Sequence, residues 1–443
     1  MASPVSSPSD QKYAKDTDMT IPPRWRPALA AALAFATCAG AGAQLLPPVP
    51  DVGGTIGSVG QSARDTLERT GNAADPLRAT VDELAAARET RLETLVRANR
   101  DRLEMTDLGP AVRGQVIAIE PDPAALAAAE QAGFTRIAEE RIEGLDIRSV
   151  TLAVPRGWSV DRALSRLRRL APSGAFTANS LHEQSGGAAV VDVTATLAQG
   201  GGGAAIGIID GGVAAHPSLR SSVQQRGFAA GAPRPSGHGT AIASLIAGQG
   251  PVRGAAPGSA LLIADVYGSD PAGGNALALA RALGWMVAQR VPVVAVSLVG
   301  RANPLVERAV REARARGTWV IAAVGNDGRA APPAYPASYA GVIAVTGVDG
   351  RGRVLIEAGR ALHLDYAAPG ADMAAAGPRG NLVPVRGTSF AVPLVAGRLA
   401  QHVRAPNPVA ALDREAVQRG GRGLGRGIIC GNCRTPVSHG SRR

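Results

Sequence analysis

Residues 204–213 read AAIGIIDGGV, in which Asp210 and two glycines close a short apolar run. The run lacks the alternation of apolar and polar residues that a half-exposed strand shows, so it predicts a strand buried on both faces. Three later runs share this character: 259–267 (SALLIADVY), 291–298 (VPVVAVSL) and 318–324 (TWVIAAV). Helical patterns alternate with the strands, at about 238–248, 275–289, 303–316 and 388–403. The alternation predicts an α/β domain over 204–404, with a parallel sheet and helices on both faces.

The positive charge of the chain comes almost wholly from arginine. The 443 residues carry a formal net charge of +11, and lysine occurs only at Lys12 and Lys15. The arginines are dispersed among acids at helical spacing, as in RANRDRLE at 97–104. This spacing indicates solvated helix faces, so we expect no nucleic-acid partner, with a general affinity for anionic surfaces as the alternative.

The N-terminal segment 1–43 is typical of an export signal with an extension before it. At 24–43, RWRPALAAALAFATCAGAGA, two arginines precede a short apolar run and then small residues. This order predicts a secretory signal cut before Gln44, with Met19 as an alternative start. The run is too short for a transmembrane anchor, so we expect an exported protein, either periplasmic or extracellular. Lipid attachment at Cys38 is an alternative interpretation.

Residues 44–110 combine a linker rich in proline and glycine with a helical segment. Apolar residues recur at helical spacing over 77–103, which predicts an amphipathic helix or a pair of helices. Gly109 and Pro110 are expected to end this segment.

Residues 111–185 change rhythm and show the order β-α-β-β-α-β. This order predicts a small ferredoxin-like α+β domain, with Ser159 capping its second helix. The glycine-rich stretch 186–203 predicts a flexible seam before the α/β domain. The sequence therefore predicts a small α+β domain in front of a larger parallel-sheet domain.

The C-terminal tail, 405–443, holds the motif CGNC at Cys430–Cys433. In an exported chain such a pair predicts a local disulfide bond. A zinc site needs a second pair of ligands, which the neighbouring sequence lacks. A redox role would need a thioredoxin-like context, which is also missing.

Four polar residues are predicted to meet at one edge of the sheet. Asp210 closes one strand, Asn326 follows another, and His238 and Ser389 each open a helix. In open parallel sheets, ligands collect outside the carboxyl ends of the strands. Each residue alone has an ordinary role as a turn residue, hydrogen-bonding partner or helix cap, but the four together indicate a catalytic site.

The chemistry of these side chains assigns a role to each. A serine hydroxyl such as that of Ser389 is a weak nucleophile and needs a base, which His238 can supply near neutral pH. Asp210 would orient the imidazole and stabilise its cation. The Asn326 amide and the backbone N–H of Ser389 would hold the oxyanion. The residues therefore predict acyl transfer by a catalytic triad.

Over 204–403 the sequence resembles the subtilisin-like serine proteases, or subtilases. IGIIDGGV, GHGTAIASLIAG and GTSFAVPLVAG are similar to the aspartate, histidine and serine blocks of that family and stand in its order. IAAVGNDG, PAYPASYAGVIAVTGVD and DYAAPG also look like subtilase segments. The resemblance implies a serine endopeptidase that hydrolyses protein or peptide substrates through an acyl-enzyme.

The resemblance also implies a set of substrate-binding residues: Ser297, Leu298, Val299, Gly300, Ala323 and Gly325. The family's Ser-Leu-Gly is interrupted here by Val299, which weighs against strand pairing of a bound peptide at this edge. Val324 stands where alanine is commoner, which predicts a tighter primary pocket.

Residues 111–183 are similar to the propeptide of the family. This implies a domain that assists folding and then blocks the cleft as an intramolecular inhibitor until it is cut. By analogy, 176–184 (FTANSLHEQ) would lie in the cleft, with processing between about 184 and 203. We expect no required cofactor. Subtilases often bind calcium, so structural calcium stays an alternative, although no dense acidic loop indicates a site.

Two departures from the family bear on activity. Gly211 stands where the family usually has Ser or Thr, so a hydroxyl that helps to hold the carboxylate is missing and lower turnover is expected. With Val299, this supports an alternative: a catalytically weak or inactive subtilase fold that binds peptides. An unrelated nucleotide-binding α/β enzyme is a further alternative, but no complete G-x-G-x-x-G or P-loop fingerprint supports it.

Overall fold

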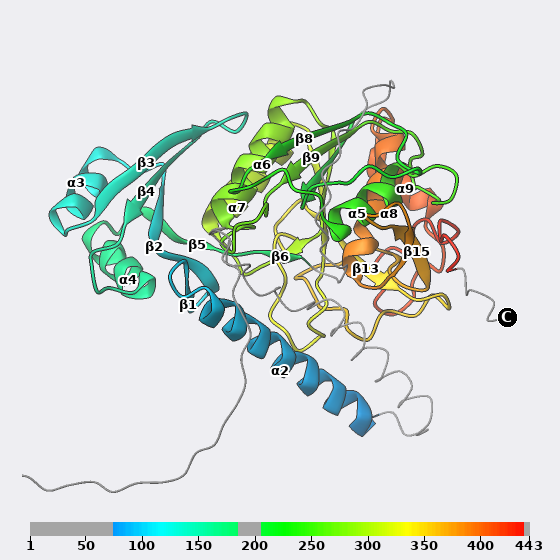
Figure 1. Ribbon diagram of the computed structural model, residues 1–443, viewed down its shortest axis with the longest axis horizontal. Coiled ribbons are helices and arrows are strands. Elements are labelled where there is room, and N and C mark those ends of the chain that lie inside the picture. Colours follow the sequence, from blue (N-terminus) through cyan, green and yellow to red (C-terminus); the bar gives the residue numbers. More distant parts are fainter. Residues whose placement is uncertain (1–73, 185–204, 438–443) are drawn as a thin grey trace, which may run out of the picture. The chain divides into compact units, whose positions relative to one another are not determined.

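The computed structural model describes residues 74–184 and 205–437. A seven-stranded sheet forms the centre of the C-terminal part (Figure 1). Its strand order is β14-β13-β12-β10-β7-β9-β8. All its neighbouring strands are parallel, which confirms the predicted α/β fold. The strands are β7 (Ile206–Asp210), β8 (Val223–Gly227), β9 (Leu261–Asp265), β10 (Val293–Val296), β12 (Trp319–Ala323), β13 (Ile343–Val348) and β14 (Tyr366–Pro369).

Helices cover both faces of this sheet. Side chains from one face, such as Ile206 and Ile208, share a buried cluster with α5 (Gly237–Ala247) and α8 (Val392–His402). Ile209 points to the other face, where the cluster includes α6 (Ala276–Ala288) and α7 (Pro304–Ala315). Successive strand residues face opposite sides, so continuous apolar strands bury both layers of helices.

Three strands of the sheet were missed from the sequence. β8 is an edge strand whose sequence, VQQRG, is largely polar, and it pairs on only one side. β13 contains Gly347, and β14 is the short run YAAP. A hairpin of β15 (Met373–Ala376) and β16 (Leu382–Val385) was missed as well. Such strands carry weak local signals and form because the neighbouring strands offer them hydrogen bonds.

The N-terminal part is an antiparallel α+β region with the predicted β-α-β-β-α-β order. Its elements are β2 (Gly109–Ile119), α3 (Pro123–Gln131), β3 (Thr135–Ile142), β4 (Ile147–Ala153), α4 (Val160–Leu170) and β5 (Ala175–Ser180). The sheet order is β5-β2-β4-β3, with an extra strand, β1 (Leu103–Thr106), also paired with β2. The Ser159 hydroxyl accepts the Arg162 N–H at 3.3 Å, which confirms the predicted cap of α4.

The predicted end of the first helix was wrong. α2 (Ala74–Ala98) ends well before Gly109, and the chain then turns into β1. The Asn99 side chain donates to the Leu95 carbonyl at 2.9 Å and closes the helix. Leu103 is fully buried and paired in β1, so it belongs to the sheet rather than to an amphipathic helix.

The α+β region packs its sheet against α6. Ile117, Ile142 and Ile147 lie in the same buried cluster as Trp285 of that helix. The turn after β3 approaches the helix very closely, because a Cβ atom on Gly144 would lie 2.2 Å from the Gly284 carbonyl oxygen. The contact therefore depends on glycine at this position.

The C-terminal tail packs on the edge of the large sheet. α9 (Pro408–Glu415) lies next to α8, and Ile428 forms a bridge with Ala367 of β14. The backbone N–H of Ala374 donates to the Thr435 carbonyl at 2.9 Å. The tail thus covers the edge strand, which removes a row of open hydrogen-bonding groups.

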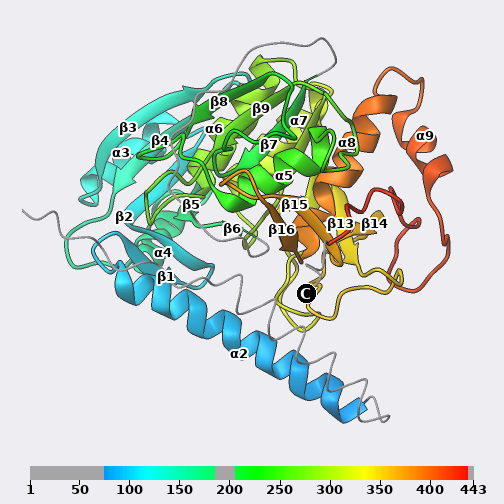
Figure 2. The same ribbon diagram turned by 45° about the vertical axis from the view of Figure 1, so that its right-hand side comes forward.

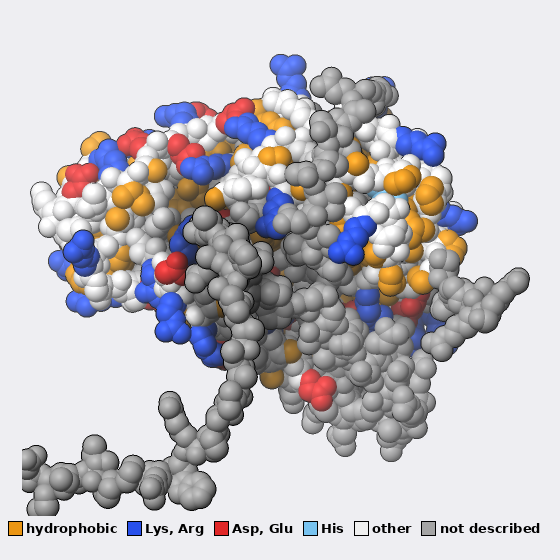
Figure 3. All heavy atoms as spheres, viewed as in Figure 1, with side chains coloured by type: hydrophobic (Ala, Val, Ile, Leu, Met, Phe, Trp, Pro, Cys, Tyr) orange, Lys and Arg blue, Asp and Glu red, His pale blue; other side chains and the backbone are white. Residues whose placement is uncertain are grey.

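The surface agrees with dispersed arginines. On the face drawn in Figure 3, Lys and Arg side chains of the described residues occur at many separate places and not over one element alone. In the part of the chain that the structure describes, we find no helix with the length and apolar character needed to cross a membrane.

Candidate active site

Asp210 and His238 meet in the interior. Asp210 is the last residue of β7, and His238 is the second residue of α5. The imidazole Nδ1 lies 3.0 and 2.9 Å from the two carboxylate oxygens of Asp210, and both side chains are buried. A carboxylate at Nδ1 orients the ring and leaves Nε2 to act on other groups.

Gly211 makes room for the helix that carries His238. The Ser236 hydroxyl accepts the Gly239 N–H at 2.9 Å and so caps α5. A Cβ atom on Gly211 would lie 2.5 Å from that hydroxyl oxygen. The Gly211 N–H itself donates to an Asp210 carboxylate oxygen at 2.7 Å. The carboxylate is therefore held from the backbone, and a larger residue at position 211 would displace the cap.

Ser389 lies in a short 3₁₀ turn, η1 (Thr388–Phe390), just before α8. Gly387 starts this turn with a φ of 140°, a conformation that residues with a side chain disfavour. The Phe390 ring lies 5.2 Å from the His238 ring, which brings the turn beside the imidazole. The Ser297 hydroxyl donates to the Ser389 carbonyl at 3.0 Å and fixes the turn from the side of β10.

Asn326 is tied to the same turn. It follows β12, and its Oδ1 accepts the Thr388 N–H at 2.9 Å. The Thr388 hydroxyl donates to the Gly325 carbonyl at 3.1 Å. Two hydrogen bonds thus join the loop of Asn326 to the turn of Ser389, and they leave the amide Nδ2 of Asn326 to donate elsewhere.

Three buried polar atoms of this site have no hydrogen-bonding partner among the described residues: His238 Nε2, Ser389 Oγ and Asn326 Nδ2. Leaving a buried polar atom unpaired costs about 1–3 kcal/mol, so such atoms are few and need an explanation. Here they are a base, a hydroxyl and a hydrogen-bond donor, the groups that acyl transfer requires.

The short strand beside these residues, Leu298–Val299, is paired with another segment of the same chain. β6 (Glu183–Gln184) pairs antiparallel with β11 (Leu298–Val299), with Leu298 opposite Gln184 and Val299 opposite Glu183. The expectation that Val299 would weigh against strand pairing at this edge was therefore wrong. Pairing uses backbone groups, and the Val299 side chain lies beside Gly325 instead.

The comparisons with known proteins agree with this geometry. The Subtilase family (Peptidase S8) matches residues 201–419. Subtilisin BL from Lederbergia lenta is 35% identical over 219 residues, which are 47% of this chain and 78% of that protein. The chain belongs to the subtilase family of serine endopeptidases.

Other comparisons bear on length and fold. M-protease from Shouchella clausii (strain KSM-K16) is 34% identical to this subtilase over 219 residues, which are 47% of this chain and 56% of that protein. The crystal structure of fervidolysin from Fervidobacterium pennivorans, a keratinolytic enzyme related to subtilisin, has a TM-score of 0.59 at 19% identity. It covers 75% of this chain and 62% of the fervidolysin chain, which shows a shared fold.

Within this subtilase, the structure refines the predicted cleft segment 176–184. Residues 175–180 form β5 and stay in the sheet of the α+β region, so the first part of that prediction was wrong. Only the residues after β5 reach the edge strand. Gln184 then contacts the site directly, because its Nε2 donates to an Asp210 carboxylate oxygen at 3.0 Å.

His182 fills a closed space beside the edge strand. Its side chain is 1% exposed, and neither ring nitrogen has a partner among the described residues. A Cβ atom on Gly300 would lie 2.6 Å from the His182 ring, so the ring fits only against glycine. Burial lowers the pKa of His182 to about 4, and the ring is neutral at neutral pH.

A phenol and a carboxyl group, those of Tyr267 and Asp265, lie on the side of the site near His182. The Tyr267 hydroxyl donates to the His182 carbonyl at 2.8 Å, and burial raises the pKa of Tyr267 well above its usual value. Burial also raises the pKa of Asp265, although three backbone N–H groups donate to its carboxylate. Sequence analysis identified neither residue, because a buried strand end carries no local sign of its neighbours.

The remaining predicted residues lie around the site. Ala323 ends β12 and is fully buried, and Gly325 precedes Asn326 with a φ of 86°. In the tail, Cys430 and Cys433 are joined by a disulfide bond. Over the described ranges 74–184 and 205–437, no group of three or more His, Cys, Asp or Glu residues could hold a metal ion.

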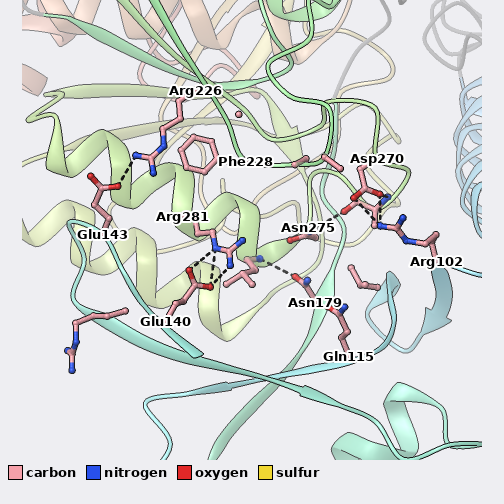
Figure 4. Close-up of a pocket in the computed structure, with 17 residues that line it drawn as sticks. Arg102, Gln115, Glu140, Glu143, Asn179, Arg226, Phe228, Asp270, Asn275 and Arg281 are labelled. Atoms are coloured by element: carbon pink, nitrogen blue, oxygen red, sulfur yellow. Dashed lines mark hydrogen bonds and ion pairs between the residues drawn. The ribbon is translucent and has the colours of Figure 1, made fainter. Parts of the chain in front are cut away.

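Away from the site, a polar cavity of about 640 Å³ lies between the α+β region and the subtilase domain (Figure 4). Ion pairs cross it: Arg281 contacts Glu140 at 2.6 Å, and Arg226 contacts Glu143 at 2.8 Å. In a third pair, Arg102 with Asp270 at 3.0 Å, the arginine belongs to the N-terminal part and the acid to the subtilase domain. The two parts are therefore held together by charge as well as by apolar contact.

Proposed function

We propose that this subtilase is an exported endopeptidase made as a self-processing zymogen. The observation that carries the proposal is the strand Glu183–Gln184, which pairs with β11 beside three catalytic atoms that have no hydrogen-bonding partner within the described ranges. A peptide chain seated in this way is presented to the nucleophile as a substrate would be. The same seating excludes other peptides, so one arrangement supports both processing and inhibition.

The chemistry follows from the positions of the side chains. Ser389 Oγ attacks the carbonyl carbon of the peptide bond, and His238 Nε2 takes the hydroxyl proton. Asp210 stabilises the imidazolium that forms. Asn326 Nδ2, with the backbone N–H of Ser389, holds the oxyanion of the tetrahedral intermediate.

The intermediate then collapses to an acyl-enzyme. His238 gives its proton to the leaving amine, the C–N bond breaks, and Ser389 keeps the acyl group as an ester. Water enters after the amine leaves, His238 removes a proton from it, and hydrolysis of the ester regenerates Ser389. No metal or other cofactor takes part in this proposal, and structural calcium has no proposed role.

The α+β region, 111–185, is proposed to be the inhibitory prodomain, of ferredoxin-like type. Its last residues leave β5 and enter the edge strand, which supports a role in blocking the cleft. Because Gln184 already contacts Asp210, we place the processing cut early in 185–203. Those residues, like the signal at 24–43, lie outside the described ranges. The signal, with its cut before Gln44, supports export to the periplasm or the medium.

The alternative of an inactive peptide-binding fold loses its two supports. Gly211 is required by the Ser236 cap, and its own N–H holds the Asp210 carboxylate in place of a hydroxyl. Val299 takes part in strand pairing. Neither departure from the family therefore argues against catalysis.

The proposal is tested with a fluorophosphonate probe and with the Ser389→Ala variant. Wild-type protein should be labelled by the probe and should mature to a shorter chain whose N-terminus falls within 185–203. Ser389→Ala should show neither labelling nor maturation. Ser221→Ala, at a buried serine outside the site, is the matched control and should behave as wild type. Maturation of Ser389→Ala to the wild-type size would refute self-processing.

A further inference from the structure

Helix α2 lies outside the β-α-β-β-α-β unit, yet it reaches the active-site rim. Figure 2 shows it as one long helix that runs along the outside of the fold and leads into β1. Two of its arginines, Arg88 and Arg91, are three positions apart and so lie on one helix face. Both arginines contact residues far away in the sequence.

Arg91 joins two elements of the site. Its guanidinium lies 3.1 Å from a carboxylate oxygen of Glu183 and 3.1 Å from one of Asp327. Glu183 belongs to the strand seated at the active-site edge, and Asp327 directly follows Asn326. Arg88 adds a second contact to Asp327, at 3.0 Å. The helix is therefore bonded both to the seated strand and to the loop that carries the oxyanion donor.

These ion pairs are shielded from water more than most surface pairs. The side chains of Arg91 and Asp327 are 15% and 14% exposed. Burial alone would lower the pKa of Arg91, but attraction to Glu183 and Asp327 outweighs it and the pKa is raised. Shielded, charge-assisted pairs of this kind are stronger than exposed ones.

An apolar contact lies one turn earlier on the helix. Leu84 is 2% exposed, and a Cβ atom on Gly328 would lie 3.3 Å from its side chain. The same helix shows what an ordinary surface pair looks like. Arg97 pairs with Glu93 of its own helix, at 3.7 Å, and both side chains are more than half exposed.

We propose that α2 is a second inhibitory segment, docked by Arg88, Arg91 and Leu84 on a surface that Asp327 and Gly328 form at the rim of the cleft. This inference rests on the proposed function as a zymogen. After the processing cut, the helix holds Glu183 and its strand at the edge, so the cut prosegment stays bound. The surface fits an amphipathic helix that bears arginines one turn apart, and residues 74–98 of this chain are its occupant.

The test uses the full chain with Arg88→Gln and Arg91→Gln combined, and Arg97→Gln as the matched control. After self-processing, release of the prosegment is followed by gel filtration and by the gain of activity on a fluorogenic peptide. We expect the double variant to release the prosegment on the order of tenfold faster, as loss of charge-assisted bonds implies. Arg97→Gln should release it at the wild-type rate.

Salt provides a second measurement. Raising the ionic strength from roughly 0.05 to 0.5 M shortens the screening length severalfold. It should speed release from the wild type more than from the double variant, in which these pairs are already broken. The ion pairs that cross the polar cavity respond to salt equally in both proteins, so the difference between them reports on α2.

A variant outside the helix covers the case in which the double variant fails to process. Glu183→Gln removes one partner of Arg91, and it should speed release no further when Arg91→Gln is also present. Equal release rates for wild type, Arg88/Arg91 and Arg97 variants, or fully additive effects of Arg91→Gln and Glu183→Gln, would overturn the inference. Absence of Ser389-dependent hydrolysis in every chain would instead overturn the proposed function.

Discussion

A buried histidine directly before the seated strand predicts that acid loosens the segment proposed above to be the inhibitory prosegment. His182 is 1% exposed, its ring nitrogens lack partners among the described residues, and burial lowers its pKa to about 4. When the strand leaves the cleft, the imidazole returns to its ordinary pKa of about 6.5. The docked state therefore favours the neutral form of the His182 ring. Docking is thus linked to the release of a proton.

The sign and size of the effect follow from these two values. A base whose pKa is lowered on docking contributes its full stability above pH 6.5, and loses it as the pH falls from 6.5 toward 4. At pH 5 the docked strand should be weaker than at pH 7.5 by about 30-fold, or about 2 kcal/mol. Tyr267 stays neutral throughout, because burial raises its pKa.

Gel filtration of the processed complex at a series of pH values from 7.5 to 5 measures this effect without relying on catalysis. The fraction of prosegment retained should fall with pH for the wild type. In His182→Leu, which keeps every other titrating group, retention should change much less. Retention that is constant with pH in the wild type, or that falls equally in both proteins, would refute the linkage.

Three further changes test other parts of the structure. Asn326→Ala removes the proposed oxyanion donor, and kcat should fall by ~10²–10³, which is the loss measured for the corresponding donor in subtilisin itself; KM for the same peptide should change little. Gly211→Ser meets the Ser236 hydroxyl and should lower stability by about 1–3 kcal/mol in a thermal melt, whereas adding Ser236→Ala should recover part of the loss. Arg281→Gln breaks a half-exposed pair with Glu140 and should weaken prosegment binding by about fivefold at most. A larger loss of prosegment affinity, measured in a binding titration, would show that the polar interface dominates this binding.

The sequence by itself determined the class of fold and the chemical groups at the site. The apolar runs that end in Asp210 and precede Asn326 are local signals for buried parallel strands, and they place both residues at one edge of the sheet. Ser159 indicates a helix start through a hydrogen bond that spans only three residues. Such features depend on neighbours in the sequence, so a single sequence carries them.

Tertiary structure alone decided what surrounds those groups. The contact of Arg91 with Asp327 joins residues 236 positions apart, and the pairing of β6 with β11 spans more than a hundred. The need for glycine at position 211 comes from Ser236, whose hydroxyl lies there because Ser236 caps helix α5. Whether such groups meet depends on how the helices and sheets pack. Local patterns of hydrophobicity and capping carry no information about contacts between residues so far apart in the sequence.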